Sequence, residues 1–230
     1  MKINAEFNKR VVVHSASMDW VASPMAGVSR RPLDRVGDEV ARATSIVRYD
    51  PGSQFSPHVH TGGEEFIVLE GIFQDEHGDF PEGSYIRNPP QSSHTPSSEA
   101  GCVIFVKLWQ FRPEDRTHVR LNSHLMQAVP HRDRKGVSVI PLYKDDYEEV
   151  EIQHWDANIQ VEIEVPDGVE MLVLDGSIAQ ESDTLVSGSW LRMPVNSTFM
   201  ATAGENGAKV WMKRYHLVYV DEQIDMLPAE

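Results

Sequence analysis

Short apolar runs separated by turn-forming and charged residues mark the first part of the chain. This pattern predicts a strand over 27–33, placed at a sheet edge by Pro32, and a second strand over 43–49. The charged residues between them, 34–42, are expected to form the loop of a hairpin. No helix is expected among residues 1–50, so this part of the chain indicates an all-β structure.

A longer apolar strand is expected over 103–111, where apolar residues occupy both odd and even positions. Because successive side chains of a strand point to opposite faces, such a strand needs cover on both. A barrel interior can cover one face, and a neighbouring sheet or subunit can cover the other. We therefore expect a homodimer, and we place a linker in the polar, Pro-containing segment 112–117.

The second half of the chain repeats the first. At a shift of 105 residues, several positions carry the same residue in both halves: Gly71 and Gly176, Gly83 and Gly188, Ser84 and Ser189, Arg87 and Arg192, and Pro89 and Pro194. A period of this length is typical of a duplicated domain, since solenoid repeats have units of about 20 to 50 residues. We expect two domains, over 1–115 and 116–230.

Composition narrows the classes of function. The 230 residues include 35 acidic and 21 basic ones, and the formal net charge of −14 disfavours nucleic acid and anionic lipid surfaces as partners. One cysteine cannot form an intrachain disulfide, and the first residues lack the apolar stretch of a signal peptide. The longest apolar stretch, 102–108, is far shorter than the ~20 residues of a membrane helix. We expect a cytoplasmic protein.

Three potential metal ligands lie close together in one stretch. His58 and His60 are two residues apart, so on a strand both imidazoles point to the same face. Residues 61–63 can form a tight reversal, after which Glu64 opens the next strand and can turn its carboxylate toward the same ion. His94 follows a further short strand and turn, and it is the natural fourth ligand. For the two histidines taken alone, the alternative is a pair of strand residues that bind no metal.

The spacing of these residues resembles the first motif of the cupin superfamily, which falls here on Gly52, His58, His60, Glu64 and Gly71. More narrowly, the stretch 58–65 with the later 94–96 resembles the C-terminal cupin domain of ChrR-type anti-sigma factors. The resemblance implies a jelly-roll barrel that holds one metal ion through three histidines and one glutamate, here His58, His60, His94 and Glu64. Together with the repeat, it implies two tandem cupin-type barrels.

The resemblance has two departures. The second cupin motif is loose, since Gly83 and His94 are eleven residues apart where the commonest form has two. The anti-sigma factors also have an N-terminal zinc domain with a His and a Cys-x-x-Cys pair, whereas this chain has one cysteine. This departure counts against carrying the anti-sigma function over with the cupin domain.

The four ligand positions become apolar in the second half. At the shift of 105 they fall on Ile163, Val165, Val169 and Phe199. Buried imidazoles and carboxylates without an ion would be uncompensated polar groups, so their replacement by apolar residues turns the same interior into ordinary core. We expect the second domain to be metal-free, and the alternative is that unrelated drift produced the apolar residues.

Lys107 falls on Met212 at the same shift, so its charge is expected only in the half that holds the ligands. There it is a candidate to face a substrate or to brace Glu64. A solvated or interface lysine is the alternative.

Three imidazoles with one carboxylate suit one divalent transition metal, such as Zn, Fe, Mn or Ni. A closed tetrahedral zinc site leaves no position for a substrate, whereas an octahedral ion with four protein ligands keeps two. Two functions therefore stay open, ahead of a third in which both barrels are purely structural. One is a sensor, regulatory or small-molecule-binding module, as the ChrR resemblance implies. The other is a metal-dependent dioxygenase or another small-molecule oxidoreductase of the cupin type.

Overall fold

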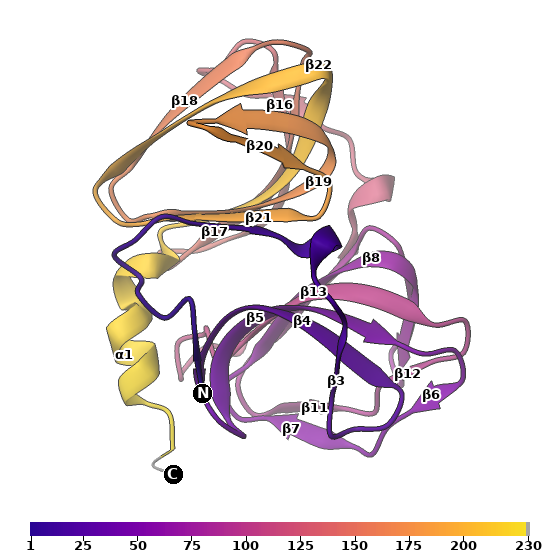
Figure 1. Cartoon of the computed structure of the whole chain (residues 1–230). Helices are drawn as coiled ribbons and strands as arrows, with labels where there is room; N and C mark the ends of the chain where they lie inside the picture. The colour runs from indigo at the N-terminus through magenta and orange to yellow at the C-terminus, as the bar shows by residue number, and fades with distance from the viewer. Residues whose placement is uncertain (229–230) are drawn as a thin grey trace. The chain divides into compact units, whose positions relative to one another are not determined.

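The computed structural model describes residues 1–228 and consists almost wholly of β-strands (Figure 1). The chain divides into two compact units. The first unit contains Met1–Ala5, Asp19–Leu125 and the described residues from Asp221 onward. The second unit contains Glu6–Met18 and Met126–Val220. The expected all-β, jelly-roll type of fold is confirmed in both.

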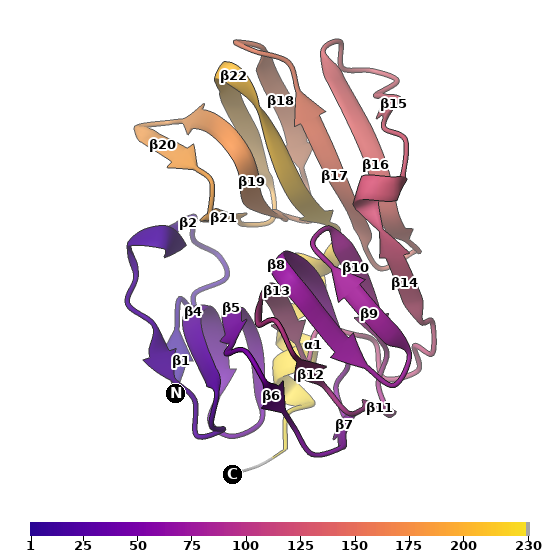
Figure 2. The same ribbon diagram turned by 90° about the vertical axis from the view of Figure 1, so that its right-hand side faces the viewer.

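The main antiparallel sheet of the first unit has the strand order β1-β4-β5-β13-β8-β10-β14 (Figure 2). Its strands are β1 (Lys2–Ile3), β4 (Val28–Gly37), β5 (Ala41–Tyr49), β13 (Cys102–Leu108), β8 (Glu64–Asp75), β10 (Ser84–Asn88) and β14 (Val119–Asn122). Shorter strands join this path: β3 (Val21–Ala22), β6 (Ser53–Gln54), β9 (Gly78–Pro81) and β12 (Ser97–Ser98). A separate pair consists of β7 (His58–His60) and β11 (Ser92–His94).

The second unit has the order β15-β16-β17-β22-β19-β21-β2, with β18 beside β22 and β20 beside β19. Its strands are β15 (Val129–Pro130), β16 (Val137–Lys144), β17 (Glu149–Trp155), β22 (Ser197–Arg214), β19 (Val169–Gln180), β21 (Ser189–Met193), β2 (Val11–His14), β18 (Gln160–Val165) and β20 (Asp183–Val186). The helical segments of residues 1–228 are short: η1 (Ser15–Ser17), η2 (Ser123–Leu125), η3 (His216–Tyr219) and α1 (Val220–Asp225). None of these helices is long and apolar enough to span a membrane.

Each unit takes one outer strand from outside its own half of the sequence. The N-terminal β2 pairs with β21 of the second unit, with Val12 opposite Leu191. In return β14, which follows the first half, pairs with β10, with Leu121 opposite Tyr85. The expected boundary at residue 115 therefore lies inside the first unit, which extends to Leu125.

The strands of the first half differ from expectation in detail. β4 is not a free edge strand, although it contains Pro32. On its outer side β3 pairs with the part of β4 before the proline, and β1 pairs with the part after it. Pro32 lies between the two covered stretches, where its lack of a backbone N–H costs no hydrogen bond to β3 or β1. The hairpin loop is shorter than expected, since β4 extends to Gly37 and β5 begins at Ala41. β13 ends at Leu108, where Trp109 adopts a φ of 58° that a strand does not continue.

The two interiors have different compositions around the expected ligand positions. The core of the second unit includes Ile163, Val165, Val169 and Phe199, all of which are buried. The first unit has an apolar core of its own, but His60, Glu64 and His94 are buried beside it.

Candidate metal centre

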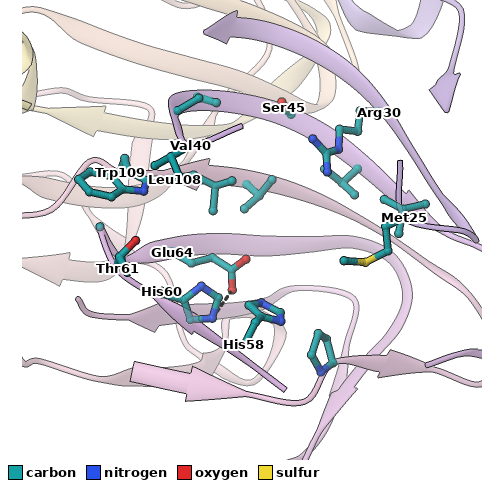
Figure 3. Close-up of a pocket in the computed structure, with 18 of the residues that line it drawn as sticks. Met25, Arg30, Val40, Ser45, His58, His60, Thr61, Glu64, Leu108 and Trp109 are labelled. Carbon is teal, nitrogen blue, oxygen red and sulfur yellow. Dashed lines mark ion pairs between the residues drawn. The ribbon is translucent and has the colours of Figure 1, made fainter. Parts of the chain in front are cut away.

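The β7–β8 turn places His58, His60 and Glu64 as the spacing predicts (Figure 3). Val59, between the two histidines, is 58% exposed and faces away from them. Gly63 has a φ of +81°, so the reversal uses a conformation that side chains rarely adopt. A Cβ at Gly62 would lie 2.1 Å from the Trp109 ring, so close packing on this turn also needs glycine.

His94 reaches the same place through β11. This strand pairs antiparallel with β7, and His94 lies directly opposite His58. The ring centroids of His58, His60 and His94 are 4.6 to 4.9 Å apart, and the rings are inclined by 71° to 80° to one another. One candidate ligand atom from each ring lies within 4.8 Å of the other two. Together they form a cluster that could hold a metal ion.

Glu64 lies beside two of the three imidazoles. Its Oε2 is 3.5 Å from His60 Nε2 and 3.6 Å from His94 Nε2. It also accepts a 3.4 Å hydrogen bond from Asn88 Nδ2. The group of mutually close ligand atoms contains the three histidines but not Glu64. Glu64 as a fourth ligand stays a prediction.

The hydrogen bonds of the rings leave Nε2 available for an ion. His94 Nδ1 is 3.2 Å from Asp75 Oδ2, and His58 Nδ1 is 3.3 Å from the Ser56 carbonyl oxygen. Because both partners only accept, each ring donates from Nδ1 and keeps a lone pair on Nε2. His60 Nε2 is buried and has no hydrogen-bond partner within residues 1–228. A buried nitrogen of this kind, in a set of three imidazoles, fits a divalent transition metal.

Burial and neighbouring charges shift the pKa values of these groups in opposite directions. Burial lowers the pKa of His94, but the hydrogen bond to Asp75 and the charge of Glu64 outweigh it, so the pKa is raised above 6.5. Burial lowers the pKa of His60 below 6.5 despite the charge of Glu64. Burial raises the pKa of Asp75, but its hydrogen bond with His94 and the charges nearby lower it overall. His60 is therefore neutral at pH 7, as coordination requires.

A cavity of about 260 Å³ in the first unit adjoins this cluster (Figure 3). His58, His60 and Glu64 form part of its wall, and apolar residues from β5 and β13, such as Val47 and Val106, form much of the rest. The volume is close to the lower end of the range for small-molecule sites, which is about 300 Å³. His58 is the most exposed of the three histidines, and it also borders the cavity.

Four residues at or near this site escaped the sequence interpretation. Arg30, Arg35 and Tyr49 line the cavity, and Asp75 supports His94. Burial raises the pKa of the Tyr49 phenol, and the charge of Glu64 raises it further, so Tyr49 is a neutral hydroxyl. The alternation of inward and outward positions along β5 could have pointed to Tyr49, but no sequence signal pairs Asp75 with His94.

Lys107 does not face the cavity. Val106 and Leu108 on either side of it line the cavity, so Lys107 points to the opposite face of β13. There its Nζ donates a 3.0 Å hydrogen bond to Thr44 Oγ1, and the residue is fully buried. The hypothesis that it faces a substrate or braces Glu64 was wrong, and its burial also contradicts the alternative of a solvated lysine.

The second unit has an equivalent lysine. Lys107 lies opposite Glu65 on the neighbouring strand, and Lys213 lies opposite Glu170. In this last strand the two halves therefore match at a shift of 106 residues and not 105, counting from Lys107 to Lys213. Lys107 corresponds to Lys213, and its predicted match with Met212 was wrong. Both lysines belong to a shared structural pattern.

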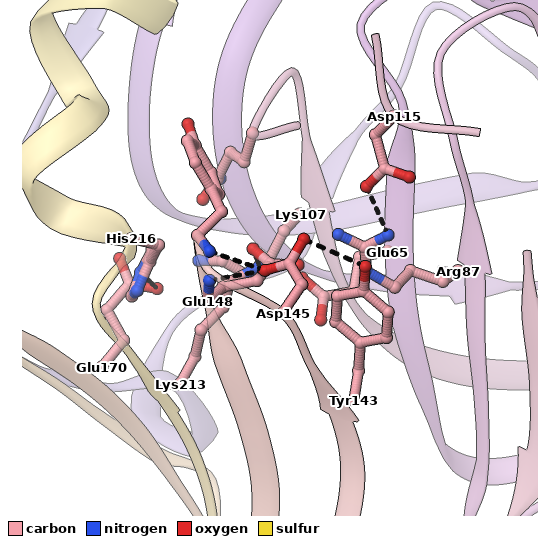
Figure 4. A network of polar contacts seen from close by, with 12 residues as sticks. Glu65, Arg87, Lys107, Asp115, Tyr143, Asp145, Glu148, Glu170, Lys213 and His216 are labelled. Carbon is pink, nitrogen blue, oxygen red and sulfur yellow. Dashed lines mark hydrogen bonds and ion pairs between the residues drawn. The ribbon is translucent and has the colours of Figure 1, made fainter. Parts of the chain in front are cut away.

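Further charged side chains are buried in each unit away from the histidine cluster (Figure 4). In the first unit Arg87 forms an ion pair with Asp115 at 2.8 Å. In the second unit Lys213 Nζ lies 2.6 Å from Glu148 Oε2. Paired groups of this kind are structural, and they leave the histidine cluster as the candidate metal centre.

Residues 8–112 match the family model described as the ChrR cupin-like domain. This range contains all four expected ligands and agrees with the resemblance in the first half. No curated protein matches the sequence.

Solved structures share the fold at low sequence identity. A candidate dioxygenase from Nostoc punctiforme has a TM-score of 0.73 and 16% identity, with 91% of this chain and 84% of that chain covered. The bacterial pirin YhhW from Escherichia coli, solved with nickel(II), has a TM-score of 0.63 and 12% identity, with 90% and 99% covered. A Cupin 2 conserved barrel domain protein from Leptotrichia buccalis has a TM-score of 0.60 and 10% identity, with 93% and 99% covered. The chain thus has the fold of cupin proteins.

Proposed function

We propose that the first unit binds one divalent transition-metal ion through His58, His60 and His94, with Glu64 as a fourth ligand. We further propose that a small molecule binds at this ion from the cavity. The second unit is proposed to bind no metal.

The observation that supports this proposal is the position of the cavity. His58, His60 and Glu64 all border it, so an ion held by these side chains has protein on one side and the cavity on the other. A closed structural site would instead surround the ion with protein ligands. An open side is the feature that lets a small molecule coordinate.

The residues of the chain have separate roles in this proposal. A bound ion would polarise the oxygen atoms of a coordinated molecule and, if redox-active, support reaction with dioxygen. Asp75 fixes the tautomer and the orientation of His94. Apolar walls from β5 and β13 exclude water from the side of the ion that faces the cavity.

The proposal leaves two uses for such a site. A ligand that binds without reacting would make the chain a metal-dependent sensor or regulatory module, in line with the ChrR cupin-like match. A reacting ligand would make it a dioxygenase or another oxidoreductase. The open side of the site favours this second function, and the fold shared with a candidate dioxygenase is compatible with it.

Metal identity in natively purified protein tests the proposal and separates the two uses. We expect one equivalent of metal in the wild type and almost none in His60→Ala, with Val59→Ala as a matched control on the same strand. Iron together with substrate-dependent oxygen uptake would support the enzyme, and zinc with no oxygen uptake would support the sensor. Wild-type protein that retains no metal under conditions that preserve its fold would refute the proposal.

A further inference from the structure

Two arginines face the cavity from β4. Figure 3 shows the Arg30 guanidinium pointing into the cavity from the wall opposite Glu64 and His58. Arg30 lies opposite Val47 of β5, which also lines the cavity. The register of this strand pair shifts between Pro32 and Asp34, and the shift brings Arg35 onto the same face.

Neither arginine forms a close ion pair with a carboxylate within residues 1–228, although Asp38 lies near enough to Arg35 for its charge to act on it. Arg30 donates a 2.9 Å hydrogen bond to Ser23 Oγ, and Arg35 donates to the backbone carbonyls of Gly37 and Asp38. Burial lowers the pKa of Arg35 and the charge of Arg30 lowers it further, while the charge of Asp38 partly opposes both. The two guanidinium groups are thus close enough to repel each other. An anion between them would relieve this repulsion.

The charges of the cavity wall balance without an ion but not with one. Glu39 and Glu64 are the acidic residues that line it, against Arg30 and Arg35. A divalent ion beside Glu64 would leave an excess of two positive charges, although the whole chain has a net charge of −14. Between the arginines and the ligand cluster the wall is mostly apolar, with Ser45 and Tyr49 as polar members. One end of the cavity suits oxygen donors to a metal, the middle suits hydrocarbon, and the other end suits an anion.

We infer that the cavity binds a small organic carboxylate. Its oxygen donors coordinate the ion, its apolar body lies against the β5 and β13 side chains, and Arg30 and Arg35 bind its carboxylate at the far end. A negatively charged oxygen at the ion and one carboxylate together neutralise the two excess charges. This inference rests on the metal-dependent binding proposed above and adds the class of ligand.

The test uses the full chain loaded with Zn²⁺, which does not oxidise the probes, and isothermal titration calorimetry. The probes are 3,4-dihydroxybenzoate and 3,4-dihydroxybenzamide, which share the metal-binding oxygens and differ in charge at the other end. A second pair is 4-oxopentanoate and 4-oxopentanamide. We expect at least one acid to bind about tenfold to a hundredfold more tightly than its amide, as for hydrogen bonds to a charged group.

Arg30→Gln and Arg35→Gln should each remove most of this preference, and Arg30→Lys should retain part of it. Arg31→Gln is the matched control, because it makes the same charge change at the next position of β4, where Arg31 instead stacks on Trp20 at 4.2 Å. Metal content is measured in every sample, so that loss of the ion is not mistaken for loss of the anion site.

Equal affinity for acid and amide in metal-loaded wild type would overturn the inference and leave the metal site intact. An acid preference that persists in both glutamine variants would also overturn it, and so would failure of all four probes to bind. Wild-type protein that cannot be loaded with metal would instead contradict the proposed function.

Discussion

The two units place different residues at one equivalent strand pair. In the first unit His58 lies opposite His94, and in the second Ile163 lies opposite Phe199. The same register therefore supports a polar cluster in one case and an apolar core in the other. The comparison shows that the fold does not require the histidines, so their presence in the first unit needs a chemical reason.

The two kinds of buried side chain also contribute differently to the free energy of folding. Burying Phe199 or Ile163 removes apolar surface from water and stabilises the second unit by about 1.5 to 3 kcal/mol per side chain. A buried imidazole nitrogen without a partner, such as His60 Nε2, costs about 1 to 3 kcal/mol. An ion would satisfy that nitrogen. In the proposed metal-bound state the first unit is thus stabilised by the ion at a position where the second unit is stabilised by packing.

The largest expected effect is the loss of metal in His60→Ala. The buried Nε2 of His60 is the nitrogen best placed for coordination, so we expect less than about a tenth of the wild-type metal to remain after dialysis. Ile163→Ala, the change at the position equivalent to His58, should leave the metal content unchanged. Wild-type metal content in His60→Ala would remove His60 from the site.

Phe199→Ala tests the contribution of packing in the core of the second unit. The ring is fully buried in the core of the second unit, so we expect the free energy of unfolding to fall by about 3 to 5 kcal/mol. Met200→Ala, at an exposed position of the same strand, is the control. Chemical denaturation measures the change, and a loss of metal from Phe199→Ala would contradict the separation of roles between the units.

Asp75→Asn should weaken metal binding without changing any candidate ligand. The hydrogen bond from His94 Nδ1 to Asp75 fixes the tautomer of the ring and makes Nε2 more basic. We expect affinity to fall by about tenfold to a hundredfold in a chelator competition assay. Asp79→Asn is the control, because it makes the same change at an exposed position whose side chain bonds to Gln74 and not to His94. Equal affinities in both variants would show that the Asp75 contact does not support metal binding.

Acid should release the metal in a way that follows the pKa of His94. Because this pKa is raised above 6.5, His94 protonates before His60 as the pH falls, and protons then compete with the ion. Affinity should begin to fall above pH 6.5 and decrease by up to about tenfold per pH unit for each histidine that protonates.

In the metal-free chain the stability that His94 contributes should change with pH in the opposite direction, and the lowered pKa of His60 works against this change. A raised folded-state pKa contributes stability that is fully present below the unfolded pKa and is lost as the pH rises through the folded pKa. Equilibrium dialysis and thermal unfolding between pH 5 and 8 measure both effects. An affinity that does not change over this range would contradict a histidine site.

The sequence predicts the local geometry of the site better than its surroundings. Alternation along a strand and the need for a glycine turn are local rules, and they place His58, His60 and Glu64 together. Strand pairing at a distance is not local, so the Asp75 contact and the position of Arg30 in the cavity wall become visible only when the strands are assembled. The strand register also corrects the match of Lys107. A displacement of one residue in the last strand changes its counterpart in the second half from Met212 to Lys213.

The exchange of outer strands escaped prediction for a similar reason. β2 reads as a short apolar run of the first half, and nothing local indicates that it pairs with β21. The repeat is visible in the sequence because the same residues recur, but a recurring pattern does not state which copy a strand joins. The short helix α1 is likewise unpredicted, since six residues are too few for a periodic pattern.

Elemental analysis of the natively purified chain tests the central claim most directly. The difference between the His58–His94 and Ile163–Phe199 pairs predicts one equivalent of a divalent transition metal per chain, lost in His60→Ala and retained in Phe199→Ala. Two equivalents of tightly bound metal in the wild type, or one equivalent that survives the His60 substitution, would contradict it.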